Sequence, residues 1–257
     1  MIILLSPSKG QDFEQNPYVP HSYPQLLAHS EQLMTTLKKL KVSDVQQLMS
    51  VSENLAELNV DRFQAFKTPF MLGQAKQAAL AFKGDVYTGL DADTWSDMDW
   101  AIAQKHIRIL SGLYGYLRPL DLIQAYRLEM KTKLQHDKYE NLYQFWGHQI
   151  TDTINKECDD WVINLASNEY FKAVKKKGLK AQVLTINFKD TKDGKTRVIG
   201  FYAKKARGQM ARAIIQNNVT SPDDIKGLSF DGYQFDDSLS EGLNWVFERQ
   251  QPPPVNG

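Results

Sequence analysis

Two short, largely apolar runs constrain the fold of this chain more than any other feature of its sequence. Met1–Leu5 ends in the polar loop Ser6–Gly10, and Trp161–Ala166 ends in the polar residues Ser167–Tyr170. Apolar runs of this length, bounded by turn-forming residues, are typical of strands buried in a sheet. Loops at the carboxyl ends of such strands are where α/β proteins bind ligands. We therefore expect a candidate ligand site at these strand ends, although an ordinary turn is the commoner origin of such a loop.

The remaining elements are predicted to be helices and hairpins in no strict order. Helical spacing dominates Tyr23–Phe82 and Leu142–Glu157. Ala181–Phe188 and Thr196–Ala203 alternate in polarity around Asp193-Gly194, the strongest hairpin signal in the chain. The order is mixed α/β and not strictly alternating, so a doubly wound sheet is not supported. We expect a mixed sheet flanked by helices.

Composition limits the classes of protein that remain. The chain has 257 residues, 42% of them hydrophobic, so we expect one compact domain at residues 1–251 and a tail at residues 252–257. Cys158 is the only cysteine, and the five histidines lack metal-binding spacing. The apolar N-terminal run is too short for a signal peptide or a membrane span. We therefore expect a soluble cytoplasmic protein with no cofactor, stable metal site or membrane partner, while its oligomeric state stays open.

Positive charge is concentrated in one block, Lys172–Arg212. The block contains thirteen Lys or Arg residues and two acids, a net charge of +11 in a chain whose net charge is +1. Such a concentration of charge lets a nearly neutral protein present one basic surface to a polyanion, while the rest of its surface does not bind polyanions nonspecifically. A solvated lysine face is the other explanation of a charge run.

The last part of the block, Ala203–Asn217, is predicted to be an amphipathic helix. Its apolar residues fall on one side of a helix wheel at about 100° per residue. The opposite side carries four cations, and Gly208 and Ala211 between them have almost no side chain. Such a face lets a large anion approach the backbone closely. The cations are Lys204, Lys205, Arg207 and Arg212.

Two glycine-containing stretches are predicted to be turns. Gly84–Gly89 is a β-prone turn segment. In the second stretch, apolar Ile107–Leu110 precedes Ser111–Gly115, and Arg118–Asp121 has a proline suited to a helix N-terminus. This order is the plan of a helix-hairpin-helix, whose backbone N–H groups grip a phosphate without reading sequence. A simple turn is the commoner explanation, since the glycines stand further apart than in the usual Gly-x-Gly hairpin.

Seven sequence blocks stand out along the chain: Ser6–Lys9, Phe82–Leu90, Leu110–Gly115, Leu117–Asp121, Tyr126–Met130, Asn164–Ser167 with Glu169-Tyr170, and Phe201–Gly208. These blocks resemble the YaaA family of peroxide-stress-resistance proteins, and the resemblance covers nearly the whole chain. The chain departs from the family pattern at Ser8, where Ala is frequent, and at Ala125, where Pro is common.

The resemblance implies a bacterial cytoplasmic protein, induced by hydrogen peroxide, that protects DNA and helps to limit free iron. It also implies a family-specific fold with a positively charged cleft. A helix-hairpin-helix-like element that binds duplex and branched DNA is implied as well.

Two functional hypotheses follow. In the first, the chain binds double-stranded or branched DNA through backbone phosphates, with the candidate residues Lys9, Ser111, Gly112, Gly115, Arg118, Lys172, Lys175, Lys176, Lys204, Lys205, Arg207 and Arg212. In the second, it is an enzyme that acts on a nucleotide or a nucleic-acid base. Its candidate pocket at the strand ends contains Ser6, Tyr87, Arg127, Asn164, Ser167 and Tyr170, with Glu169, Asp121 or Glu129 as general base. Direct iron sequestration is not supported, because the ligands are dispersed in the sequence.

Overall fold

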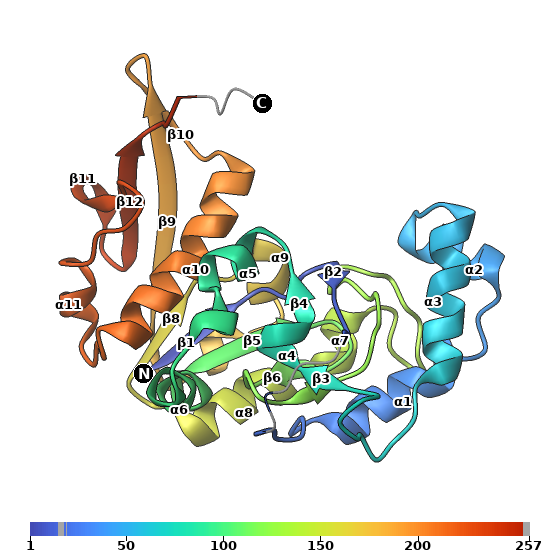
Figure 1. Cartoon of the computed structure of the whole chain (residues 1–257). Coiled ribbons are helices and arrows are strands. Elements are labelled where there is room, and N and C mark those ends of the chain that lie inside the picture. The colour runs from blue at the N-terminus through green and yellow to red at the C-terminus, as the bar shows by residue number, and fades with distance from the viewer. Residues whose placement is uncertain (15–17, 19, 254–257) are drawn as a thin grey trace.

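A mixed sheet with a parallel centre organises the structure, a computed structural model that describes residues 1–14, 18 and 20–253 (Figure 1). Within these residues, eight strands pair in the order β11-β12-β9-β8-β1-β5-β6, with β10 on β9. The five strands from β12 to β5 are parallel, and the others pair antiparallel. The strands are β1 (Ile2–Leu5), β5 (Ile107–Ser111), β6 (Gly115–Leu117), β8 (Trp161–Asn164), β9 (Gln182–Lys192), β10 (Lys195–Arg197), β11 (Gln234–Glu241) and β12 (Asn244–Gln250).

Helices flank this sheet, so the predicted mixed α/β class is confirmed. Two small two-stranded sheets, β2 (Gly10–Gln11) with β4 (Phe82–Lys83) and β3 (Lys76–Gln77) with β7 (Leu122–Ile123), tie loops to the body. The helices are α1 (Leu27–Leu37), α2 (Val42–Met49), α3 (Glu53–Ala65), α4 (Ala78–Ala81), α5 (Asp85–Leu90), α6 (Asp97–His106), α7 (Leu142–Trp146), α8 (Gln149–Glu157), α9 (Asn168–Phe171), α10 (Gly200–Gln216) and α11 (Pro222–Ile225).

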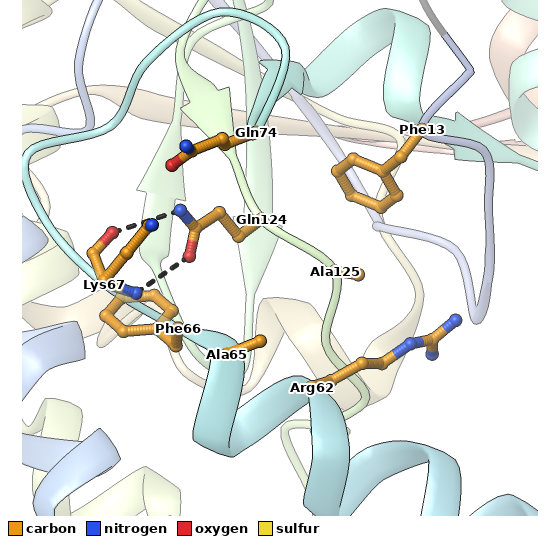
Figure 2. A pocket seen from close by; sticks show the side chains of 8 residues that line it. All are labelled: Phe13, Arg62, Ala65, Phe66, Lys67, Gln74, Gln124 and Ala125. Carbon is orange, nitrogen blue, oxygen red and sulfur yellow. Dashed lines mark hydrogen bonds between the residues drawn. The ribbon is translucent and has the colours of Figure 1, made fainter.

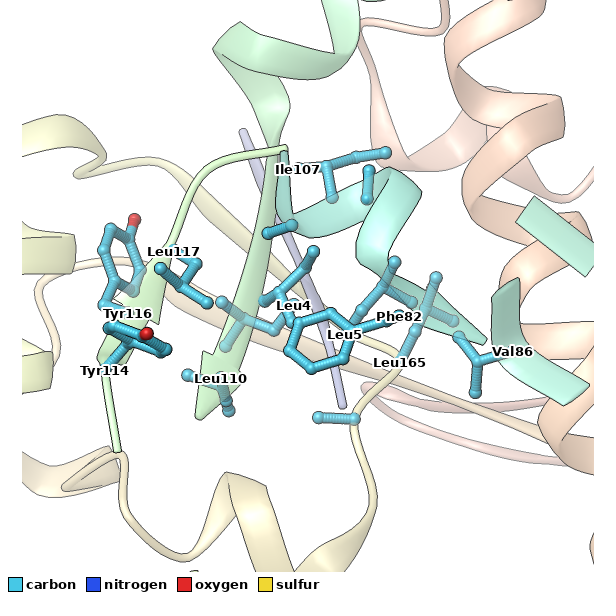
Figure 3. Packing of buried hydrophobic residues seen from close by; sticks show 14 of the residues in the cluster. Leu4, Leu5, Phe82, Val86, Ile107, Leu110, Tyr114, Tyr116, Leu117 and Leu165 are labelled. Atoms are coloured by element: carbon cyan, nitrogen blue, oxygen red, sulfur yellow. The ribbon is translucent and has the colours of Figure 1, made fainter. Parts of the chain in front are cut away.

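The first strand lies at the centre of the core. All four residues of β1 are buried, and because side chains alternate along a strand, both faces of the sheet are covered there. Figure 3 shows Leu4 and Leu5 packed among Phe82, Leu110 and Leu165. The sequence did not support a doubly wound sheet, yet β1 has parallel neighbours on both sides, β5 and β8. The strand order therefore reverses at β1, which creates a crevice at the carboxyl ends of the strands.

Two predicted turns have a different structure. Gly84–Gly89 was expected to be β-prone, but Asp85–Leu90 forms the helix α5. The helix-hairpin-helix is not confirmed, because β5 and β6 form a β-hairpin and residues 118–121 form a turn without a helix.

Both glycines of this hairpin lie in the interior: a Cβ at Gly112 would lie 2.2 Å from the Leu128 carbonyl oxygen, and one at Gly115 would lie 2.6 Å from the Trp146 ring. Glycine is therefore required at both positions, because a side chain there would overlap the Leu128 carbonyl group or the Trp146 ring.

The hairpin at Asp193-Gly194 is confirmed. Asp193 and Gly194 have φ values of 51° and 71°, the conformation that a two-residue hairpin turn requires. The strand predicted at Thr196–Ala203 ends earlier than expected, at Arg197, and α10 begins at Gly200.

Helices α5 and α10 approach each other at two glycines. A Cβ at Gly208 would lie 1.8 Å from the Val86 carbonyl oxygen, and one at Gly89 would lie 2.1 Å from the Lys205 carbonyl oxygen. Ala211 is also buried. The small residues of α10, which the sequence suggested would admit an anion, instead admit the backbone of α5.

We expect Gly208→Ala to destabilise the protein by about 2–3 kcal/mol, because the added methyl group forces the two helices apart. Urea unfolding followed by circular dichroism measures the change. Gly200→Ala is the matched control in the same helix, where no atom lies within 4 Å of the added Cβ. Equal stability of the two variants would contradict the close contact.

Candidate functional site

A cleft of about 600 Å³ lies at the carboxyl ends of β1 and β8. The strand order reverses at this edge of the sheet, the usual position of a ligand site in a parallel α/β structure. Figure 1 shows α5, α9 and α10 close to one another around these strand ends. The lining residues are Ser6–Lys9, Gly84–Val86, Glu129, Lys131, Ser167–Tyr170, Lys204 and Arg207.

Hydrogen bonds between the two strand-end loops fix the floor of the cleft. The Ser167 backbone N–H donates to Ser6 Oγ at 2.9 Å, and Ser6 Oγ donates to Ser167 Oγ at 3.3 Å. Buried Tyr87 donates its hydroxyl to the Ser6 carbonyl oxygen at 3.0 Å. Asn164 Oδ1 accepts from the Ala166 N–H at 3.1 Å. Of these four predicted pocket residues, Ser6 and Ser167 line the cleft, whereas Tyr87 and Asn164 support it from behind.

Tyr170 and Ser8 complete the loops of the cleft. Burial raises the pKa of the Tyr170 phenol, as it does for Tyr87, so both hydroxyls stay protonated at neutral pH. The Ser8 hydroxyl donates to the Lys83 carbonyl oxygen. The expected phosphate contact of Ser8 therefore competes with a hydrogen bond that ties the loop after β1 to β4.

Two cations of α10 face the cleft, Lys204 and Arg207. They are three residues apart and so lie on one side of the helix. Within the described part of the chain, the Arg207 side chain forms no ion pair or hydrogen bond, and its Nε atom is buried without a partner. Burial lowers the pKa of the Arg207 guanidinium, because removal from water disfavours its charged form. A half-buried guanidinium without an acid is costly in free energy, and a bound anion would remove that cost.

Carboxylates on the other side of the cleft are held by lysines. Glu129 lies 3.0 Å from Lys9 Nζ, 3.5 Å from Lys131 Nζ and 3.8 Å from Arg127. Burial would raise the pKa of Glu129, but these cations outweigh it and hold the pKa below its usual value. Glu169 accepts from the Lys131 N–H at 3.3 Å. This network links the loop after β1 to α9.

The other predicted cations lie outside the cleft lining. Lys172 places its ammonium 5.0 Å from the centre of the Tyr143 ring. Lys175 and Lys176 continue the chain beyond α9, where the Lys175 N–H donates to Thr151 Oγ1. Lys205 lies 4.0 Å from Asp231.

Two predicted arginines have structural partners. Arg212 donates to the carbonyl oxygens of Leu90 and Asp91 at the end of α5, at 3.2 and 2.8 Å. Arg118 pairs with buried Asp121 at 3.0 Å. Because Arg118 follows β6, which is antiparallel to β5, it lies at the opposite edge of the sheet from the cleft. Ser111 is fully buried and hydrogen-bonds to the Tyr126 hydroxyl at 2.6 Å.

Sequence reasoning missed Lys131 and Asp85 as lining residues. Lys131 belongs to a stretch in which buried Tyr126, Leu128 and Met130 alternate with more exposed residues. This period of two is the signal of an extended segment, and it would have placed Arg127 and Glu129 on one side. Lys131 itself lies in the turn at residues 129–132. No comparable signal marks Asp85, because the segment was predicted to be a turn and is the start of α5.

The described residues contain no group of three or more His, Cys, Asp or Glu side chains that could hold a metal ion. Within the same residues, no helix has the length and apolar character needed to span a bilayer. The cleft thus offers cations, hydroxyl groups and carboxylates as its chemistry.

Comparisons with known proteins match nearly the whole chain. A family model described as peroxide stress protein YaaA matches residues 1–239. A UPF0246 protein of Colwellia psychrerythraea is 51% identical over 257 residues, covering 98% of this chain and 100% of the relative. A UPF0246 protein of Acaryochloris marina is 48% identical over 251 residues, with 97% and 100% covered. The matched residues include every element that builds the cleft.

We expect Glu129→Gln to flatten the acid dependence of stability. A carboxylate with a lowered folded-state pKa stabilises the protein above its unfolded-state pKa of about 4.3, and this contribution is lost as the pH falls through the folded-state value. The wild type should therefore lose more thermal stability than the variant between about pH 5 and pH 3. Melting temperatures across this range, with the exposed carboxylate variant Glu57→Gln as control, measure the difference. Parallel curves for the wild type and Glu129→Gln would show that the network contributes nothing.

Proposed function

The chain belongs to the peroxide stress protein YaaA family, and on that premise we propose that it is a DNA-binding protein of the hydrogen peroxide stress response. It holds phosphate groups of DNA in the cleft at the ends of β1 and β8. We place this activity in the cytoplasm. The resemblance to the family also implies that the protein helps to limit free intracellular iron. This is a separate proposal, which anaerobic calorimetry with Fe²⁺ tests.

The observation that carries this proposal is the unpaired guanidinium of Arg207 beside Lys204. Phosphodiester oxygens accept hydrogen bonds from the planar fork of an arginine, and a neighbouring ammonium adds attraction without further geometry. Lys9 is 57% exposed at its side chain while it pairs with Glu129, so it can also turn toward a phosphate. In this proposal, these three cations supply the phosphate contacts of the cleft.

The size of the cleft decides which part of DNA enters it. A volume of about 600 Å³ is that of a small-molecule site. One nucleotide of a single strand, a strand end or a branch point fits such a cleft, whereas a duplex does not. We propose that the remaining DNA lies against the exposed lysines beyond α9, which contribute through charge alone. Ser111, Gly112 and Gly115 have no part in this proposal, because they are buried.

A second candidate function is catalysis on the bound nucleotide. The observation that favours it is the position of Glu129 and Glu169 in the same cleft as the Ser6 and Ser167 hydroxyls. A carboxylate facing a bound nucleotide can act as a general base toward water or a hydroxyl. Mass spectrometry of DNA and mononucleotides after incubation with the protein distinguishes turnover from binding alone.

We expect Arg207→Gln to weaken DNA binding by about tenfold or more, the value of a charge-assisted hydrogen bond. The slope of log K against log salt should become shallower by about one unit, since one phosphate contact is lost. Fluorescence anisotropy with a labelled branched oligonucleotide, titrated across salt concentrations, measures both.

Lys177→Gln is the matched control, because it removes one positive charge from an exposed residue of the same basic block outside the cleft. It should change the affinity by much less than Arg207→Gln. Equal losses in the two variants would assign binding to general charge and reject the cleft. A wild-type affinity that does not change with salt would reject phosphate binding altogether.

A further inference from the structure

A second cavity, of about 420 Å³, lies at the end of α3 and shares no lining residue with the cleft (Figure 2). One wall is the end of α3 and the residues after it, Arg62 and Ala65–Lys67. A second wall is Gln124 and Ala125, and Phe13 lies across the cavity from Ala65 and Phe66 in Figure 2. Nothing in the proposed DNA contact uses this cavity.

The charge of this cavity is unbalanced. Its lining contains the cations Arg62 and Lys67 and no acid. Within the described part of the chain, the Arg62 side chain forms no hydrogen bond or ion pair, and burial together with the charge of Arg127 lowers the pKa of Arg62. The carboxyl end of α3 favours a cation by only about 0.3–1 kcal/mol, so the helix dipole does not balance two neighbouring guanidiniums.

Arg127, two residues beyond Ala125 of the second wall, adds to this excess of positive charge. It follows Ala125 by two residues on an extended segment, so both side chains lie on the same side of that segment. The Nε atom of Arg127 is buried without a partner, and its ion pair with Glu129 is long, at 3.8 Å. Arg62, whose side chain has no acid partner, thus lies near Arg127, whose partner Glu129 is 3.8 Å away.

The walls of the cavity are held in place before any ligand arrives. Gln124 Nε2 donates to the Lys67 carbonyl oxygen at 3.0 Å, and the Lys67 N–H donates to Gln124 Oε1 at 3.1 Å (Figure 2). This pair of bonds ties the end of α3 to the segment that carries Arg127. Phe13, Ala65, Phe66 and Ala125 add apolar surface. A preformed cavity with apolar walls and a few polar groups is the usual form of a small-molecule site.

We propose that this cavity is a second anion-binding site, one that takes a nucleotide. The phosphate binds to Arg62 and Arg127, and the flat base lies against the ring of Phe13. The Arg62 guanidinium gains an acceptor where it has none, Arg127 gains one for its unpaired Nε atom, and the base covers apolar surface that is otherwise open to water. The same chemistry recognises a free mononucleotide and a nucleotide at the end of a strand. The proposal does not rest on DNA binding in the cleft.

Isothermal titration calorimetry with adenosine 5′-monophosphate tests the proposal on the full-length protein. We expect Arg62→Gln to weaken binding by about tenfold or more, whereas Lys39→Gln, which removes an exposed charge outside the cavity, leaves it unchanged. Phe13→Ala should weaken binding of the mononucleotide but not of inorganic phosphate. Arg62→Gln should melt no lower than the wild type, because it removes one of two repelling charges.

The cleft variant Arg207→Gln separates the two sites. Mononucleotide binding that persists in Arg207→Gln and is lost in Arg62→Gln supports the second site, even if DNA binding in the cleft fails its own test. A 5′-phosphorylated oligonucleotide that competes with the mononucleotide identifies a strand end as the ligand, and failure to compete identifies the free nucleotide. Absence of binding to the wild type, or equal binding to the wild type and Arg62→Gln, would overturn the proposal.

Discussion

The close approach of α5 and α10 is the constraint on which the candidate site depends. Gly89 and Gly208 let the two helix backbones touch, and no other residue fits at either position without moving a helix. This contact, together with Arg212 at the end of α5, sets the position of α10 over the strand ends. Lys204 and Arg207 consequently face the cleft. A packing requirement between two helices thus decides where the charge of α10 is presented.

Among the cations of the basic block, the important difference is between those with and without a partner. Arg212 donates its hydrogen bonds to backbone carbonyl oxygens at the end of α5. Arg207, in contrast, is half-buried and has no acid within ion-pair distance among the described residues. Exposed ion pairs and solvated lysines contribute little net free energy. A desolvated guanidinium without a partner is different, because an anion can recover the lost hydration. Of the thirteen cations in the block, Lys204 and Arg207 line the cleft, and Arg207 has a buried Nε atom without a partner.

Local patterns in the sequence predicted the parts of the structure that local physics decides. The apolar runs at Met1–Leu5 and Trp161–Ala166 are adjacent strands, and their polar ends meet through Ser6 and Ser167. Asp193-Gly194 is a hairpin because its backbone conformation is a property of those two residues. The glycines at 112 and 115 could not be interpreted this way. Glycine is needed there because the fold brings the Leu128 carbonyl and the Trp146 ring, from elsewhere in the chain, against these two positions.

The segment from Gln124 to Lys131, which ends in a turn at residues 129–132, connects the two cavities physically. Gln124 and Ala125 line the cavity at α3, and Glu129 and Lys131 line the cleft, so the segment spans at most about 25 Å between them. Buried residues at every second position anchor it to the core. Arg127 lies between the two sites and contacts Glu129 on the cleft side. An anion bound as proposed at Arg62 and Arg127 would therefore compete with Glu129 for the Arg127 guanidinium.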